Sequence, residues 1–299
     1  PKNIGILIDF LKSKRQVRKI IRDFNPDVVV GVGGYASAAT LNAAYDLGIP
    51  CLIQEQNSFA GLTNKTLAKK ASKICVAYEG MERFFPADRI LLTGNPVRQN
   101  LSSPSLNKEE ACAHFSFNPN TPTVLLIGGS LGARTLNESV LHSLDEIRNS
   151  SVQFIWQTGS YYKEHIAQEL QKHGQPSNLY VTDFIRSMDM AYKAADLVIS
   201  RAGASSISEL CLLGKPSILV PSPNVAEDHQ THNAMALVKK DAALIVKDCE
   251  AEGKLIPLAL KTVTDTPLLD SLGKNAQNMA FVDSDQKIAQ EVLQLIVNK

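Results

Sequence analysis

The chain has 299 residues, 44% hydrophobic and 20% charged, and its 31 Lys and Arg residues against 30 Asp and Glu leave a net charge of +1. This length suits two domains of ordinary size, and the near-neutral charge argues against a general nucleic-acid binder, which usually has a strong basic excess. The five scattered cysteines form no CxxC motif. They are therefore predicted to be reduced, mostly buried thiols rather than a disulfide framework or a zinc site.

The first segment combines an apolar stretch at residues 4–11, beginning with Ile4 and ending with Leu11, with a basic run. The run comprises Lys12, Lys14, Arg15, Arg18, Lys19 and Arg22. An apolar patch beside cationic side chains suits peripheral binding to anionic lipid, worth about 1 kcal/mol per basic residue near the surface. The alternative is an ordinary amphipathic helix packed on a sheet through Val17, Ile20, Ile21 and Phe24. The two interpretations are compatible if the basic face of the helix stays exposed.

Residues 27–54 are predicted to form one βαβ unit. A β-branched run at 27–32 indicates a buried strand, and small residues at 37–47 indicate a helix that Gly48 and Pro50 end. A second short strand follows at 51–54. A parallel crossover of this kind is almost always right-handed.

The pattern breaks at residues 95–122, a segment rich in proline that we interpret as a domain linker with a short helix. Alternating strands and helices then resume. Strands are expected at 123–127, 154–157, 179–181, 197–200 and 217–220, and helices from 133 to about 147 and at 161–172, 205–213, 230–240 and 286–297. This alternation predicts a doubly wound α/β sheet in each half, with ligands at the carboxyl ends of the strands and a cleft between the two domains.

Three expected strands end in small-residue turns that each lead into a helix, at residues 31–34, 128–132 and 201–206. Helix N-termini offer unpaired N–H groups and partial positive charge to phosphate, and glycine lets the backbone approach the anion. One such turn alone more often serves a tight βα connection; three together favour a phosphorylated ligand. None matches GxxxxGK[ST], and none is a complete GxGxxG followed by an acidic residue, so a nucleotide sugar is favoured. Glu209, about one turn into the third helix, is placed to accept hydrogen bonds from ribose hydroxyls.

Several strings, in chain order, resemble the MurG family of GlcNAc transferases, which convert lipid I to lipid II in peptidoglycan synthesis. They are GGYAS at 33–37, EQN at 55–57 with AGLTN at 60–64, GNPVR at 94–98, GGSLGAR at 128–134, VTDFI at 181–185, RAGA at 201–204 with SE at 208–209, and Gln230 with NA at 233–234. The resemblance spans nearly the whole chain.

The resemblance implies the GT-B fold, two Rossmann-like domains facing a cleft. We expect an acceptor- and membrane-facing domain at 1–97, with residues 286–299 packing back on it, and a UDP-GlcNAc-binding domain at 98–285. Expected substrate-binding residues are Asn57, Arg98, Ser130, Ile185, Ala204, Ser205, Ser206, Ile207, Ser208, Glu209 and Gln230. Of these, Glu209 would bind the ribose, the Ile185 backbone the uracil, Gln230 the GlcNAc hydroxyls and the turn around Ser130 the diphosphate. Asn57 and Arg98 would close the site.

The chain also departs from the family pattern. Family members begin with a further strand and a Gly-rich loop carrying a histidine favoured as a catalytic residue, whereas this chain begins at Pro1. We therefore expect a truncated form, which can be inactive by itself. Gln54 and His229 differ from some members. Glu55 is the only acidic residue in a family-matching loop of the first domain, and it is predicted either to act as the general base or to order its loop.

Two patterns resemble metal sites. Asp283-Ser284-Asp285 has the DxD form but precedes the last helix, where an N-cap is the better interpretation. His229 and His232 resemble a ligand pair but more often such residues lie on the surface. We therefore expect no metal and no cofactor.

The resemblance thus implies an inverting transferase that moves GlcNAc from UDP-GlcNAc to the 4-hydroxyl of lipid I at the cytoplasmic face of the bacterial cell membrane. Its partners would be UDP-GlcNAc, lipid I and an anionic membrane surface, with no nucleic acid. Two alternatives stay open: another GT-B enzyme, such as a glycolipid synthase or a UDP-GlcNAc epimerase, and a non-catalytic UDP-sugar-binding subunit.

Overall fold

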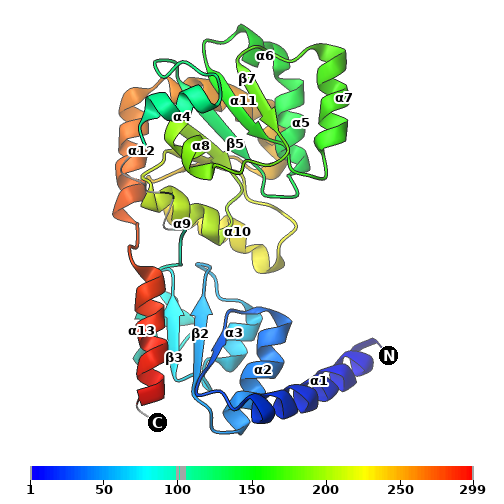
Figure 1. The fold of residues 1–299 in the computed structure, drawn as a ribbon, viewed down its shortest axis with the longest axis vertical. Coiled ribbons are helices and arrows are strands. Elements are labelled where there is room, and N and C mark those ends of the chain that lie inside the picture. The colour runs from blue at the N-terminus through cyan, green and yellow to red at the C-terminus, as the bar shows by residue number, and fades with distance from the viewer. Residues whose placement is uncertain (1, 99–100, 102–105, 298–299) are drawn as a thin grey trace. The chain divides into compact units, whose positions relative to one another are not determined.

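The computed structural model describes residues 2–98, 101 and 106–297, with the side chains described from residue 12 onward. The chain divides into two compact units (Figure 1). The first runs through Pro96 and resumes at Phe281, and the second is Val97–Ala280. The apolar stretch at residues 4–11 lies on the backbone of the first helix, but its side chains lie outside the described residues.

The first unit is a parallel four-stranded sheet with helices. Its elements are α1 (Lys2–Phe24), β1 (Val29–Gly31), α2 (Gly34–Asp46), β2 (Cys51–Glu55), α3 (Leu62–Leu67), β3 (Lys73–Val76), β4 (Ile90–Leu92) and α13 (Ser284–Val297). Two short 3₁₀ turns, Met81–Arg83 and Ala87–Arg89, precede β4. The strand order is β1-β2-β3-β4, and every described pair is parallel. The βαβ prediction is thus confirmed.

Helix α1 packs on α2 rather than on the sheet (Figure 1). Ile21 is buried in the core of this unit, and Val17 is half-buried against it. Ile20 and Phe24, by contrast, are 63% and 79% exposed, so the prediction that they pack inward is wrong. The reason is that only one narrow stripe of α1 faces α2.

The second unit is a six-stranded parallel sheet covered on both faces. Its strands are β5 (Thr123–Ile127), β6 (Gln153–Gln157), β7 (Leu179–Thr182), β8 (Leu197–Ser200), β9 (Ser217–Leu219) and β10 (Leu244–Ile245). Its helices are α4 (Lys108–His114), α5 (Arg134–His142), α6 (Leu144–Asn149), α7 (Lys163–His173), α8 (Met188–Ala194), α9 (Ala204–Leu212), α10 (His229–Val238), α11 (Ala251–Val263) and α12 (Thr266–Asn278), with 3₁₀ turns at Ala226–Asp228 and Asp248–Glu250.

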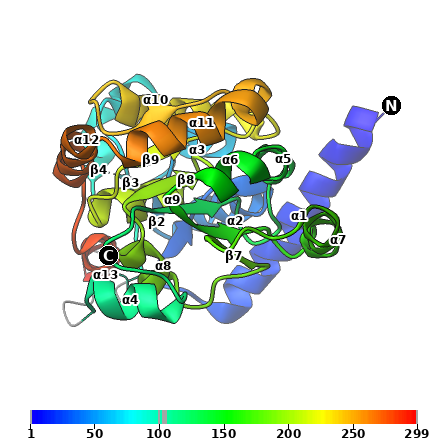
Figure 2. The same ribbon diagram turned by 90° about the horizontal axis from the view of Figure 1, so that it is seen from above.

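Alternate residues of the strands pack into two separate cores, one on each face of the sheet. Leu125 and Ile127 of β5 pack with α4, α8, α9, α10 and α12, whereas Val124 and Leu126 pack with α5, α6, α7 and α11. Side chains of a strand alternate between the two faces of its sheet, so both faces of a buried parallel strand must be apolar. Helix α4 lies against α8 (Figure 2). The segment expected as a linker therefore contributes a core helix to this unit.

The strand order is β10-β9-β8-β5-β6-β7. From β5 the chain adds β6 and β7 on one side, then crosses to the other side of β5 and adds β8, β9 and β10. This is the order of a Rossmann sheet, and the reversal lies between β5 and β8. Ligands of such sheets bind beyond the carboxyl ends of the strands at this point. No described helix is long and apolar enough to cross a membrane.

Candidate functional site

A cavity of about 630 Å³ lies at the switch point of the second unit. The turn after β5 lines it with Gly128, Gly129 and Gly132, and the turn after β8 lines it with Arg201 and Gly203. Its volume falls within the usual range for small-molecule sites, about 300–1,000 Å³. Two of the three glycine turns predicted to bind phosphate therefore meet in one cavity.

The turn after β5 requires glycine where backbones come close. A Cβ atom on Gly128 would lie 2.7 Å from the amide nitrogen of Ala133, and Gly132 has a φ of +88°. Helix α5 begins directly after this turn, and its N-cap Ala133 offers no side-chain hydrogen bond. Its first N–H groups therefore have no partner within the helix, the arrangement that suits an anion.

Helix α9 opens on the same cavity. Its N-cap is Gly203, again with no side-chain cap, and Ser205 and Ser206 of its first turn line the cavity. The backbone N–H groups of that first turn have no carbonyl partner within the helix. Two helix N-termini with their partial positive charges thus face one space, which suits a diphosphate.

Gln157, at the carboxyl end of β6, ties two loops of the site together. Its Nε2 donates to the carbonyl oxygen of Gly129 at 3.0 Å, and its Oε1 accepts from the backbone N–H of Ile185 at 2.9 Å. The Ile185 amide is therefore occupied, and its carbonyl is the backbone group left for a base. Phe184, half of whose surface is exposed, lines the cavity beside it.

The carboxylate of Glu209 lies in the wall of the cavity with both oxygens engaged. Oε2 accepts from the hydroxyl of Tyr192 at 2.8 Å. Oε1 accepts from Nη2 and Nε of Arg98 at 2.9 and 3.2 Å. Burial, and after it the neighbouring Glu209 carboxylate, raise the pKa of Tyr192 above its usual value, so this tyrosine stays a hydrogen-bond donor.

Arg201 joins three loops beneath the cavity. Its guanidinium donates to the carbonyl oxygens of Val220 and Pro221 and forms an ion pair with Asp248. The other carboxylate oxygen of Asp248 accepts from the hydroxyl of Thr135 at 2.9 Å. This network fixes the ends of β8 and β9 relative to the start of α5.

Gln230, at the start of α10, lines the cavity and is oriented by its neighbour Ser222. Its Oε1 accepts from the Ser222 backbone N–H at 2.9 Å. The amide nitrogen of the side chain is then the group that a hydroxyl ligand would meet. A 3₁₀ turn before α10 holds Glu227 and Asp228 at positive φ, which sets the start of this helix.

Six of the predicted substrate-binding residues line this one cavity: Arg98, Ile185, Ser205, Ser206, Glu209 and Gln230. Ser130 belongs to the turn after β5, and Ala204 and Ser208 belong to α9, but none of the three is among its lining residues. The Ile207 side chain is 2% exposed and packs in the core, so its contribution to the site is to anchor α9.

Asn57 and Glu55 belong to the first unit. The buried Glu55 carboxylate accepts from the backbone and side chain of Asn57 and, through its other oxygen, from the Gly61 N–H and the Asn64 amide, at 2.8–3.3 Å. Four hydrogen bonds within one loop favour the loop-ordering role of Glu55 over a base, which needs an accessible oxygen.

Sequence reasoning missed several lining residues. Gln157, Phe184, Met188, Tyr192, Ser222 and Asp248 line the cavity without having been predicted. Phe184 stands next to a predicted residue within the matched string at 181–185, so adjacency was an available signal. The others come from β6, α8, the loop after β9 and the 3₁₀ turn at Asp248–Glu250, and only the folded sheet brings them together.

Neither metal-like pattern forms a metal site in the described part of the chain, where no group of three or more His, Cys, Asp or Glu side chains is placed to hold an ion. His229 Nδ1 lies 2.6 Å from the carbonyl oxygen of Ala226. The Asp283 carbonyl accepts from the N–H of Lys287, so this segment begins α13.

Comparison with known proteins gives a consistent result. Residues 123–292 match the C-terminal domain of glycosyltransferase family 28 and residues 1–76 its N-terminal domain. Proteins named UDP-N-acetylglucosamine–N-acetylmuramyl-(pentapeptide) pyrophosphoryl-undecaprenol N-acetylglucosamine transferase are 56% identical in Bacteroides fragilis (98% of this chain, 78% of the relative) and 57% identical in Parabacteroides distasonis (99% and 80%).

Among solved structures, MurG of Acinetobacter baumannii is 30% identical, with a TM-score of 0.78 over 96% of this chain and 80% of that one. Its likeness supports the GT-B fold predicted for the two parallel-sheet units. The motifs, both domain matches and the identity over nearly the whole chain agree. This chain therefore belongs to glycosyltransferase family 28 and, within it, to the MurG family.

Proposed function

We propose that this protein transfers GlcNAc from UDP-GlcNAc to the 4-hydroxyl of lipid I, the undecaprenyl-pyrophosphoryl-linked MurNAc-pentapeptide, and so forms lipid II in peptidoglycan synthesis. The observation that carries the proposal is the cavity of the second unit, where two helix N-termini and the Glu209 carboxylate converge. Positive helix ends suit a diphosphate, and a carboxylate suits a ribose diol. The names of the relatives supply the identity of the sugar and of the acceptor.

Within the cavity each part of the sugar nucleotide has a matching group. The Ile185 carbonyl and the Phe184 ring are suited to uracil, Glu209 to the ribose, the starts of α5 and α9 to the diphosphate, and the Gln230 amide to the GlcNAc hydroxyls. The second unit then binds the sugar donor, and the first unit the acceptor. Ser130 and Arg98 complete the proposed contacts of the second unit, and Asn57 is the proposed substrate contact of the first unit.

The proposed reaction is a single displacement that inverts the anomeric centre. The acceptor 4-hydroxyl attacks the anomeric carbon of α-linked GlcNAc, loses its proton to a general base, and UDP leaves with the bonding electrons. Charge that develops on the β-phosphate is stabilised by the N–H groups of the two helix N-termini and by Arg98. These groups are fixed before the reaction, which is the condition for strong electrostatic stabilisation.

Calorimetric titration tests the sugar-donor site. UDP-GlcNAc should bind more tightly than UDP-glucose or UDP-galactose, and Glu209→Ala should weaken it at least about tenfold, because a hydrogen bond to a charged group contributes about 1.5–3 kcal/mol. Glu138→Ala, a half-buried glutamate of α5 that does not line the cavity, is the matched control and should bind as the wild type does. Equal affinity for all uridine nucleotides would count against the proposed sugar specificity.

A turnover assay tests the reaction itself. UDP release from UDP-GlcNAc should require a lipid I analogue, and NMR of the product should show a β-linked GlcNAc. Conversion of UDP-GlcNAc to its C2 epimer would instead identify an epimerase. Tight nucleotide binding with no release of UDP in the presence of acceptor would favour a binding subunit.

We further propose that the protein works at the cytoplasmic face of the bacterial cell membrane, held there peripherally by α1. Lys12, Arg15 and Lys19 are exposed along this helix, while Lys14 forms an ion pair with Asp46 and Arg18 is half-buried. The exposed Ile20 and Phe24 add apolar surface to the same helix. Together with the apolar residues at 4–11, these groups suit an anionic lipid surface.

Vesicle sedimentation tests this surface. The protein should bind vesicles that contain anionic lipid, not purely zwitterionic ones, and replacing Lys12, Arg15 and Lys19 by Gln should weaken binding at least about tenfold. The matched control replaces three exposed lysines of the second unit, Lys239, Lys240 and Lys261, by Gln. If both triple variants lose binding equally, net charge rather than α1 would be responsible.

A further inference from the structure

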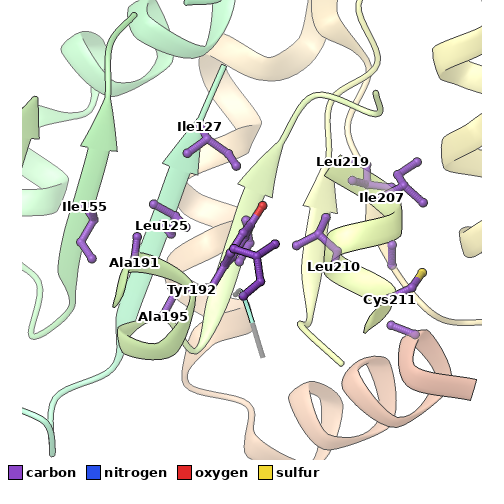
Figure 3. Packing of buried hydrophobic residues seen from close by; sticks show 14 of the residues in the cluster. Leu125, Ile127, Ile155, Ala191, Tyr192, Ala195, Ile207, Leu210, Cys211 and Leu219 are labelled. Atoms are coloured by element: carbon purple, nitrogen blue, oxygen red, sulfur yellow. The ribbon is translucent and has the colours of Figure 1, made fainter. Parts of the chain in front are cut away.

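Glu209 has two unequal partners. Tyr192, on α8, is 1% exposed and packs in the core with Leu125, Ala191 and Ile207 (Figure 3). Arg98 has 56% of its side-chain surface exposed, against 11% for Glu209. A buried aromatic ring has little freedom to move, whereas an exposed arginine can leave its partner at small cost.

The two partners also occupy the carboxylate differently. Tyr192 uses one site on Oε2, while Arg98 directs both Nε and Nη2 at Oε1. A carboxylate offers about four acceptor positions. A ribose diol that approaches from the cavity therefore finds Oε1 taken by Arg98, and it must displace at least one of these bonds.

We propose that Tyr192 is a positioning residue that holds the Glu209 carboxylate in place for the ribose, and that Arg98 is an exchangeable partner that the ribose displaces when the nucleotide binds. The inference rests on the proposed function, since it takes the ligand to be a uridine nucleotide. The displaced guanidinium is then available to the diphosphate, because Arg98 lines the same cavity as the two helix N-termini. One contact thus links ribose recognition to phosphate recognition.

Affinities for UDP and for 2′-deoxy-UDP, measured by calorimetry, test the role of Tyr192. The wild type should bind UDP more tightly than 2′-deoxy-UDP. Tyr192→Phe should lower the affinity for UDP roughly tenfold and change the affinity for 2′-deoxy-UDP little, so that the preference for UDP is lost. The control is Tyr180→Phe, a half-buried tyrosine packed against the same core, which should keep the preference. A purely structural role for Tyr192 would weaken both nucleotides equally and overturn the proposal.

Glu209→Gln separates this inference from the function on which it rests. If Glu209→Gln loses the preference for UDP but Tyr192→Phe keeps it, the ribose site stands and the positioning role is wrong. If Glu209→Gln keeps the preference as well, the ribose does not bind at Glu209, and the proposed binding mode fails with it.

Uridine, which lacks phosphate, tests the exchange at Arg98. In the wild type uridine must displace the guanidinium with no phosphate to receive it, so Arg98→Ala should bind uridine as tightly or more tightly, in NMR titrations, while binding UDP about tenfold more weakly. Equal weakening of uridine and UDP in Arg98→Ala would refute the exchange.

Discussion

The backbones of Gly132 and Gly159 cross so closely that a Cβ atom on Gly159 would lie 2.0 Å from the amide nitrogen of Gly132. Gly159 also has a φ of +83°, a conformation that L residues rarely adopt. We expect Gly159→Ala to lower the free energy of unfolding by more than about 2 kcal/mol, because the backbone must shift at a strained position. Urea unfolding measures this loss, and UDP binding should weaken with it.

Gly253→Ala is the matched control for that substitution. Gly253 lies inside α11, and nothing stands within 4 Å of a Cβ atom added there. Since glycine is a poor helix former, the free energy of unfolding of this variant should rise by about 0.5–1 kcal/mol. A loss at both positions would mean that the close crossing is not what makes Gly159 necessary.

Gln157→Leu should weaken nucleotide binding as well as stability. Gln157 is 5% exposed, and its amide holds the Gly129 turn and the Ile185 amide. The substitution therefore leaves the N–H of the buried Ile185 unpaired and removes one of the two hydrogen bonds that the Gly129 carbonyl accepts, the other being from the Gly132 N–H. The expected loss of stability is about 1–3 kcal/mol. Calorimetry with UDP should show a clear loss of affinity in protein that circular dichroism shows to be folded.

Gln153 provides the comparison from the opposite end of the same strand. Its side chain accepts from the Asn118 N–H at 2.8 Å and donates to the Asn118 carbonyl at 3.0 Å, far along β6 from the cavity turns. Gln153→Leu should therefore cost similar stability but bind UDP as the wild type does. If it weakened UDP binding equally, loss of stability alone would explain the effect of Gln157→Leu.

Lys215 should make stability depend on pH in the alkaline range. Burial lowers the pKa of Lys215 from the usual 10.5 to about 8, and its Nζ donates to the Ala195 carbonyl at 2.6 Å. Between about pH 8 and 10.5 the unfolded chain then binds more protons at this residue than the folded one, so its contribution to stability rises with pH. Below pH 8 Lys215 is charged in both the folded and the unfolded state, so burial of the charged amine lowers the free energy of unfolding by its full amount.

Lys215→Met removes that cost, so it should stabilise the protein at pH 7, on the order of 1 kcal/mol after the lost hydrogen bond is subtracted. The advantage over the wild type should shrink as the pH rises from 8 to 10. Urea unfolding at a series of pH values measures it, with the exposed Lys261→Met as control. A constant difference between wild type and Lys215→Met across this range would contradict the burial of a charged amine.

The strands of the second unit show what sequence patterns can predict. The predicted strands at 123–127 and 197–200 coincide with β5 and β8, because short β-branched runs bounded by turn residues are distinctive. β10 has only two residues, too few for a pattern. Helix α11 contains both Gly253 and Pro257, which argue against a helix locally; burial of Leu255 and Ile256 outweighs that preference.

The residues of the candidate site likewise fall into two groups: those that the sequence predicts and those that only the fold brings into the site. Glu209 was predicted because it follows a glycine turn with a clear chemical use, and Gln230 because it stands in a string that resembles a family. Tyr192 was not, because its value lies in one hydrogen bond to a residue on another helix. Such a contact is set by the packing of α8 and α9 on one face of the sheet, and no local pattern carries that information.

The five cysteines should differ sharply in reactivity toward a thiol reagent. Cys51, Cys75, Cys112 and Cys211 are buried, and burial raises the pKa of each thiol, to about 12 for Cys211, so almost no reactive thiolate forms. Cys249 alone is exposed among these cysteines. Native protein should therefore react rapidly at one thiol, and the protein in denaturant at all five. Cys249→Ser should abolish the rapid phase; if it persists, one of the buried thiols is reached by local opening of the core.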